Sequence, residues 1–148
     1  MVLTNEATKI IVKKIPNLKK TSDWNYYEEN TQWDDYMLER CSKESLDFTK
    51  LMHVLTDYVA SMLQNDREEK EEKELKEIFL LIEHLVEKGD KSVKSATTTN
   101  FLENLINISS HGDFEPSTFI HYLGPESKAY CKAWDEFTGV KTPGLWDE

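Results

Sequence analysis

Residues 24–36, WNYYEENTQWDDY, hold the densest set of side chains that could recognise a ligand. The segment lacks lysine and arginine, and it combines five aromatic residues with four carboxylates: Trp24, Tyr26, Tyr27, Glu28, Glu29, Trp33, Asp34, Asp35 and Tyr36. Aromatic rings give large rigid contact surfaces, and carboxylates can bind arginine or lysine side chains of a partner. The alternative is that four of the rings anchor the segment onto the core: Trp24, Tyr27, Trp33 and Tyr36. Both interpretations can hold together.

Catalytic residue types are present, but they are not arranged in a catalytic pattern. Residues 109–115, SSHGDFE, contain serine, histidine and aspartate. Neighbours in sequence do not produce the geometry of a triad, and no GxSxG turn accompanies them. A glycine-rich phosphate loop is also missing. We therefore expect that the protein is not an enzyme, with a small hydrolase as the last-ranked alternative.

The histidines and cysteines do not form a metal-binding motif. The histidines, at positions 53, 84, 111 and 121, lack HExxH spacing, and the cysteines, at positions 41 and 131, lack CxxC spacing. His111 and His121 bracket a loop near Asp113, which leaves open a site assembled in space. We expect no metal and no cofactor, and we expect both thiols to be reduced and structural.

The expected location is the cytoplasm. No window approaches the roughly 20 apolar residues that span a bilayer, and residues 1–14 lack the apolar run of a signal peptide. Two unpaired cysteines also fit a reducing compartment better than secretion.

Charge is unevenly distributed along the chain. The formal net charge is −10, but residues 1–20 hold five lysines against one glutamate, so an acidic body follows a small basic head. Such a surface does not favour a phosphate backbone, because phosphate binding needs a basic groove. It favours a basic protein partner, since complementary fields speed association.

Helical spacing of apolar residues predicts a single all-α domain over residues 1–148, with five to seven helices. The expected elements are a short helix within 1–15, a core helix at 46–63, a helical hairpin at 67–108, a helix at 125–138 and an extended tail at 139–148. In the hairpin, Gly89 is expected to adopt the left-handed conformation and Asp90 to cap the second helix. Four side chains should be buried together across the hairpin: Phe79, Ile82, Val93 and Phe101.

Three further expectations concern the charged run, the last helix and the tail. The charged run 67–76 has spacings that permit pairs one turn apart, such as Glu69 with Lys73 and Glu72 with Lys76. The core-facing side of the last helix should contain Tyr130, Ala133, Trp134 and Phe137. Near its end the tail contains Leu145 and Trp146, which either dock onto the bundle or are presented to a partner.

The run Asp90-x-x-Val93-Lys94-x-Ala96 resembles the inner turn of a HEAT-type repeat, although Lys94 stands where arginine is common. With one recognisable repeat, a compact bundle is expected rather than a solenoid. The order of the segments, with IPNLKK after the first helix and YLGPESKAYCKAWDEF near the end, resembles small HEAT-like all-helical bacterial proteins. These include immunity proteins of contact-dependent inhibition and other polymorphic toxin systems.

The resemblance implies a protein that binds and neutralises a cognate toxin domain by covering its active site. The expected partner is a basic toxin domain, for which a nuclease is one option. The chain is expected to be a monomer or dimer that binds neither nucleic acid nor membrane directly. The alternative is an interaction or regulatory scaffold without a toxin partner. The candidate partner-binding residues are Glu28, Glu29, Trp33, Asp34, Asp35, Tyr36, Glu69, Glu72 and Trp146.

Overall fold

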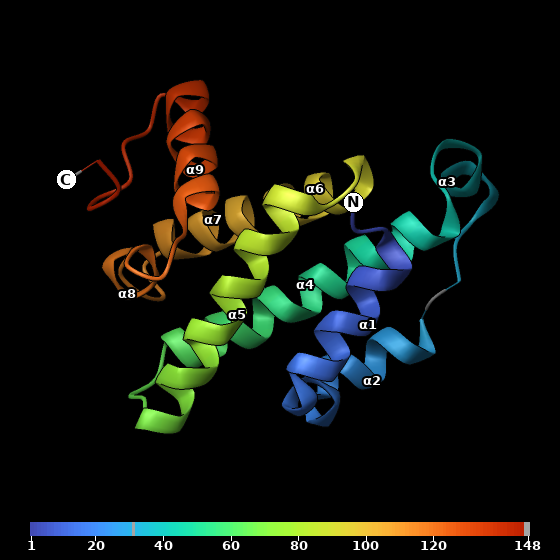
Figure 1. The fold of residues 1–148 in the computed structure, drawn as a ribbon, viewed down its shortest axis with the longest axis horizontal. Coiled ribbons are helices and arrows are strands. Elements are labelled where there is room, and N and C mark those ends of the chain that lie inside the picture. The colour runs from blue at the N-terminus through green and yellow to red at the C-terminus, as the bar shows by residue number, and fades with distance from the viewer. Residues whose placement is uncertain (31, 147–148) are drawn as a thin grey trace.

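The computed structural model describes residues 1–30 and 32–146, and it confirms the all-α prediction. About 75% of the chain is helical, and the described residues contain no strand. The elements are α1 (Thr4–Lys14), the 3₁₀ turn η1 (Pro16–Lys20), α2 (Ser22–Glu29), α3 (Asp35–Arg40), α4 (Lys43–Leu63), α5 (Glu69–Lys88), α6 (Lys91–Ala96), the π-helical segment η2 (Thr97–Glu103), α7 (Asn104–Ser110), α8 (Ser117–Ile120) and α9 (Pro125–Thr138). Figure 1 shows α1–α3 toward one end of the molecule and α7–α9 toward the other, with α4 and α5 between them.

Counting α6, η2 and α7 as one continuous helix, the described residues form eight helices, where five to seven were expected. The expected N-terminal, core, hairpin and C-terminal helices correspond to α1, α4, α5 with α6–α7, and α9. The sequence pattern missed α2, α3 and α8 because each has at most eight residues, too few to show a clear apolar period. None of the described helices combines the length and the apolar character needed to cross a membrane.

The buried side chains form one hydrophobic cluster, centred on α4, α5 and the helix that follows the hairpin turn. Phe79, Ile82, Val93 and Phe101 are all buried, as predicted. The rings of Phe79 and Phe101 meet edge to face at 5.6 Å between centroids. Contact between Phe79 of α5 and Phe101 of η2 therefore holds the two sides of the hairpin together.

Gly89 ends α5 in extended backbone, with φ −64° and ψ 155°, so the predicted left-handed conformation is wrong. Glycine is needed at this position for space. A Cβ atom would lie 2.5 Å from Cγ1 of Val93 and 2.6 Å from the Leu85 carbonyl oxygen. Val2 also pairs with the turn, because its N–H donates to Lys88 and its carbonyl accepts from Asp90, both at 2.8 Å. The predicted Asp90 cap is confirmed by a 2.8 Å bond from the Val93 N–H.

Replacing Gly89 by alanine should lower the free energy of unfolding by about 1 to 3 kcal/mol, because the new methyl group overlaps backbone and a buried β-branched side chain. Urea unfolding followed by circular dichroism measures the change. Lys91→Ala, an exposed position in the next turn, is the matched control and should change stability by no more than about 0.5 kcal/mol. Equal stability of the two variants would contradict the close packing of this turn.

The C-terminal tail docks onto α9 through a buried carboxylate. Asp135 is 2% exposed and accepts hydrogen bonds from the Thr142 N–H (2.6 Å), the Thr142 hydroxyl (2.7 Å) and Trp146 Nε1 (3.0 Å). Leu145 is completely buried. The described part of the tail, up to residue 146, therefore docks onto the bundle. Gly139 ends α9 in the left-handed conformation, with φ 75°, and there the chain turns back toward the helix.

The predicted core-facing side of α9 is confirmed for Tyr130 and Trp134, which are partly buried against the core, and is wrong for Ala133 and Phe137. Ala133 is exposed and Phe137 is 83% exposed, whereas Ser127, Cys131 and Asp135 are buried. Apolar spacing alone did not reveal that a serine and an aspartate find buried partners.

Candidate partner-binding site

A hollow of about 280 Å³ lies between α2 and α4, beside the acidic aromatic segment. Its lining combines carboxylates, one histidine, one lysine and two tyrosines: Asp23, Tyr26, Tyr27, Lys50, His53, Val54 and Asp57. On α4 the polar lining residues fall at positions 50, 53 and 57, which is helical spacing along one face. A polar stripe on a core helix was the sequence signal that could have revealed this hollow.

Local sequence explains how α2 presents its half of the hollow. Thr21 caps the helix by accepting a 3.1 Å bond from the Trp24 N–H. Trp24 and Tyr27, three residues apart, are 7% and 9% exposed and pack with ring centroids 5.2 Å apart. This burial rotates Tyr26 outward, where it is 62% exposed.

The hollow contains two carboxylates, Asp23 and Asp57, and one lysine, Lys50. The pKa of Asp57 is raised by burial and by the neighbouring charge of Asp23, and His53 offsets part of this rise. Among the described residues, no ion pair within 4.0 Å involves either carboxylate. Two incompletely balanced carboxylates at one hollow would be stabilised by an arginine or lysine side chain from outside.

Lysine from α4 supplies the positive charge that the segment 24–36 lacks in sequence. Lys50 donates to the Asn30 carbonyl and lies over the rings of Tyr26 at 5.2 Å and Trp33 at 5.4 Å. Trp33 also donates to Asp47 at 2.8 Å. The rings of Trp24, Tyr27 and Trp33 therefore anchor the segment onto the core, as the alternative interpretation of the sequence predicted for these three residues.

Two of the four candidate carboxylates on the segment accept hydrogen bonds within the chain, and the other two are exposed. Glu28 accepts a bond from Trp24 Nε1, and Asp34 caps α3 by accepting from the Met37 N–H at 2.9 Å. Losing that cap should cost about 1 kcal/mol, so Asp34 is unsuitable for a pure test of binding. Glu29 and Asp35 are exposed.

Tyr36 is not anchored to the core. It is 62% exposed, and the guanidinium of Arg40 lies 3.5 Å from its ring centroid. The predicted anchoring of this ring is therefore wrong, because α3 contains no buried residue that would hold it. Tyr36 remains available at the surface.

The other three candidates lie on different elements and do not join the hollow. Glu69 opens α5. Glu72 binds Arg67 at 2.9 Å and accepts from the Tyr122 hydroxyl, which replaces its predicted pair with Lys76. The hydrogen bond from Tyr122 and the contact with Arg67 lower the pKa of Glu72, whereas burial and the Glu72 carboxylate raise the pKa of Tyr122 to about 12. Trp146 docks on Asp135, and Lys132 lies 5.4 Å from its ring.

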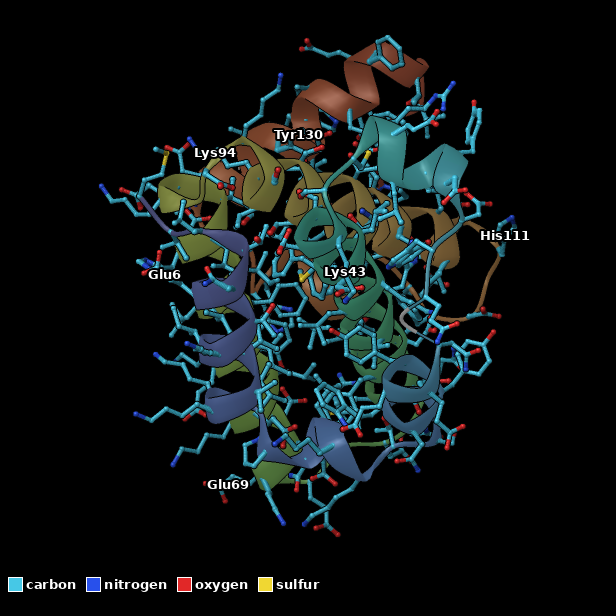
Figure 2. All side chains as sticks on the ribbon, turned by 90° about the vertical axis from the view of Figure 1, so that its right-hand side faces the viewer. Glu6, Lys43, Glu69, Lys94, His111 and Tyr130 are labelled. Atoms are coloured by element: carbon cyan, nitrogen blue, oxygen red, sulfur yellow. The ribbon has the colours of Figure 1, made fainter. Side chains whose placement is uncertain are left out.

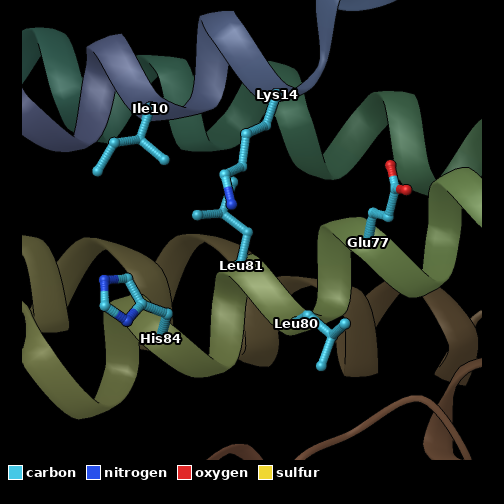
Figure 3. A pocket seen from close by; sticks show the side chains of 6 residues that line it. All are labelled: Ile10, Lys14, Glu77, Leu80, Leu81 and His84. Carbon is cyan, nitrogen blue, oxygen red and sulfur yellow. The ribbon is translucent and has the colours of Figure 1, made fainter.

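A second hollow, of about 510 Å³, lies between α1 and α5 (Figure 3). Ile10, Leu80 and Leu81 supply its apolar lining, and Lys14, Glu77 and His84 line it as well. Leu80 is 62% exposed. This groove suits apolar side chains and lacks the carboxylate pair of the α2–α4 hollow.

Ser109, Ser110 and His111, which raised the possibility of hydrolysis or metal binding, lie at the end of α7 and in the turn that follows it. Ser109 is buried and donates to the Ile106 carbonyl at 2.7 Å, and Ser110 donates to Asn107 at 2.7 Å. His111, labelled in Figure 2, lies in the turn after α7. Across residues 1–30 and 32–146, no group of three or more histidine, cysteine, aspartate or glutamate side chains could hold a metal ion.

Comparison with known proteins identifies a family. Residues 8–139 match the model of a family described as a domain of unknown function, DUF7674, and because this match spans most of the chain, the protein belongs to that family. The comparisons with curated proteins and with solved structures returned no match.

Proposed function

We propose that this member of the DUF7674 family is an immunity protein, which binds a basic toxin domain and covers its active site. The observation that carries the proposal is the α2–α4 hollow, with Asp23 and Asp57 beside the exposed ring of Tyr26. The resemblance of the sequence to HEAT-like helical immunity proteins supplies the class of partner. The cytoplasm, where such a toxin would act, is the proposed location.

Binding would proceed in two physical steps. The net charge of −10 attracts a basic domain over a distance of about one Debye length, which raises the association rate. An arginine or lysine side chain of the toxin then enters the hollow between Asp23 and Asp57, with its stem against Tyr26. Glu29 and Asp35 provide further carboxylates at the edge of this surface.

Inhibition would be steric and would need no chemistry from this chain. A nuclease groove is basic because it holds a phosphate backbone, so an acidic surface can occupy the same groove. Trp24 and Tyr27 fix α2 against the core, which keeps the carboxylates in place before binding and reduces the entropy lost on association.

The direct test of function uses the toxin domain encoded by the gene immediately upstream. Equimolar protein should abolish the activity of that domain and protect cells that express it. The absence of an upstream toxin gene, together with no binding to any toxin domain tested, would favour the alternative of a scaffold. The apolar α1–α5 groove supports that alternative, since it offers a docking surface independent of charge.

The affinity should depend on the ionisation of Asp57. The raised pKa of this group means that its ionised form destabilises the free folded protein, so the stability of the free protein increases as pH falls through that pKa. A bound cation favours the ionised form and so lowers the pKa of Asp57. Affinity should therefore decrease as pH falls through the raised pKa of the free protein, and in that pH range calorimetry in two buffers of different ionisation enthalpy should detect proton release on binding. Asp57→Asn should reduce both effects, and identical pH profiles for the two proteins would contradict the role of Asp57.

A further inference from the structure

A second surface of the molecule places lysines beside the apolar α1–α5 groove. Next to that groove, α1, η1 and α5 surround another hollow of about 430 Å³, and the two share Lys14 and Glu77. This second hollow, called the lysine hollow below, is lined by four lysines against two glutamates, with a proline and an asparagine: Lys13, Lys14, Pro16, Asn17, Lys70, Lys73, Glu74 and Glu77. A chain with a formal net charge of −10 therefore has a local excess of positive charge here.

The four lysines of this hollow keep their charges available to a partner. All four residues are exposed, and among residues 1–30 and 32–146 none of them makes an ion pair within 4.0 Å. Glu74, by contrast, accepts hydrogen bonds from the Tyr58 hydroxyl and from the Asn17 amide, the latter at 3.2 Å. Lys70 lies in the first turn of α5, where the helix dipole opposes a cation, so helix stability does not account for its presence.

The groove and the lysine hollow lie along one face of α5. Lining residues of this helix fall at positions 70, 73, 77, 81 and 84, which is helical spacing over a length of roughly 21 Å. Lysines occupy the beginning of this face, and Leu80 and Leu81 lie toward its end, across from Ile10 of α1 (Figure 3). A helix of about 14 residues has the same length, so the surface fits a helical segment that is acidic at one end and apolar at the other.

The apolar part of this face is accessible. Helix α1 packs against α4, and α5 packs against α6 and α9. Leu80 is 62% exposed, and Ile10 is only partly buried. Apolar side chains of a partner that cover these two residues would remove their exposed area from water, which favours association.

A short helix suits this surface better than a membrane or a nucleic acid does. Charges separated by more than about one Debye length are screened, so a helix in the groove is attracted mainly by the lysines that it contacts. An anionic membrane or a polynucleotide would also extend over the acidic remainder of the molecule. In addition, the described residues that line the groove and the lysine hollow include no aromatic ring on which a base could stack.

We propose that the α1–α5 groove and the lysine hollow together bind a helical segment of a protein partner, with carboxylates at one end and apolar side chains at the other. The carboxylates pair with the four lysines, and the apolar side chains cover Ile10 and Leu80. This surface shares no lining residue with the α2–α4 hollow, so the inference does not rest on the proposed function.

Fluorescence anisotropy with labelled synthetic peptides tests the inference on the full chain. The probes are helical peptides of about 14 residues, with leucines on one face over two turns and glutamates on that face over the other two, in both chain directions. The wild type should bind one of them with a Kd below about 100 μM, and added salt should weaken binding. Peptides with lysine in place of glutamate, or serine in place of leucine, should bind at least about tenfold more weakly.

Two variants locate the binding surface. Lys14→Glu/Lys73→Glu reverses two charges of the lysine hollow, and Leu80→Glu places a charge in the apolar groove. Each should weaken binding of the acidic peptide at least about tenfold. The substituted residues are exposed, so circular dichroism should show that both variants are folded.

The matched controls are exposed residues on other helices. Lys91→Glu/Lys94→Glu on α6 reverses the same number of charges, and Phe137→Glu on α9 replaces an apolar residue that is 83% exposed. Both should bind the acidic peptide like the wild type.

Three results would overturn the inference: no peptide binds at about 100 μM protein, the lysine or serine peptide binds as tightly as the acidic one, or the lysine-hollow variant binds like its control. Vesicles of phosphatidylserine and phosphatidylcholine provide the remaining comparison. If they bind the wild type but not the lysine-hollow variant, while no peptide binds, the surface belongs to a membrane contact instead.

Discussion

Replacing Phe101 by alanine should lower the free energy of unfolding by about 3 to 5 kcal/mol. The side chain is completely buried and meets the edge of Phe79 across the hairpin, so its loss leaves a cavity where α5 contacts η2. Neighbouring helices cannot close this cavity without moving the segment that joins α6 to α7. Urea denaturation, monitored by the helical circular dichroism signal, measures the change.

Leu80→Ala is the matched control for this prediction. Leu80 lies on α5, one residue from Phe79, but is 62% exposed, so its truncation should cost no more than about 0.5 kcal/mol. A loss below about 1 kcal/mol for Phe101→Ala would contradict the packing of the hairpin core.

Replacing Asp135 by alanine should destabilise the protein by roughly 2 to 4 kcal/mol and release the C-terminal tail. Three donors, the N–H and hydroxyl of Thr142 and the indole of Trp146, would lose their common acceptor. Two of these groups are in a buried residue, so they cannot recover the loss fully by binding water. Limited proteolysis should then cleave between residues 139 and 146 much faster than in the wild type.

Glu136→Ala is the neighbouring control, because Glu136 is exposed and does not contact the tail by a hydrogen bond among the described residues. Its unfolding free energy and cleavage rate should resemble those of the wild type. Equal cleavage rates for the Asp135 and Glu136 variants would show that the carboxylate of Asp135 does not hold the tail.

Features that depend on residues close in sequence were predictable, whereas features that depend on contacts made only in the folded chain were not. Helices α4 and α5 were predictable because each has about 20 residues with a continuous apolar face. The Asp90 cap was predictable because it depends on residues three positions apart. Gly89 was assigned the wrong conformation because its constraint comes from Val2, Leu85 and Val93, which approach it only in the folded chain.

The candidate site was predictable in part. Residues 24–36 indicated a recognition surface, but half of the hollow comes from α4, whose polar positions were hidden within a core helix. Glu28 and Asp34 accept hydrogen bonds from residues three or four positions away, which the sequence prediction did not consider. On α9, the hydrogen bonds that Thr142 and Trp146 donate to Asp135 bury a carboxylate that apolar spacing had not placed toward the core.

The most direct test of the central claim is the salt dependence of binding to the upstream-encoded toxin domain. Surface plasmon resonance should compare the wild type with an Asp23→Asn/Asp57→Asn variant, which removes both charges of the hollow while preserving side-chain shape. Asp113→Asn/Glu115→Gln removes two exposed carboxylates from the loop before α8 and serves as the charge-matched control.

The account predicts that the hollow variant associates about tenfold more slowly at low salt, loses most of its salt dependence and dissociates faster, while the control retains wild-type kinetics. A fully desolvated contact would weaken binding by about 2 to 5 kcal/mol. The contradictory result is equal affinity and equal salt dependence for the hollow variant, the control and the wild type.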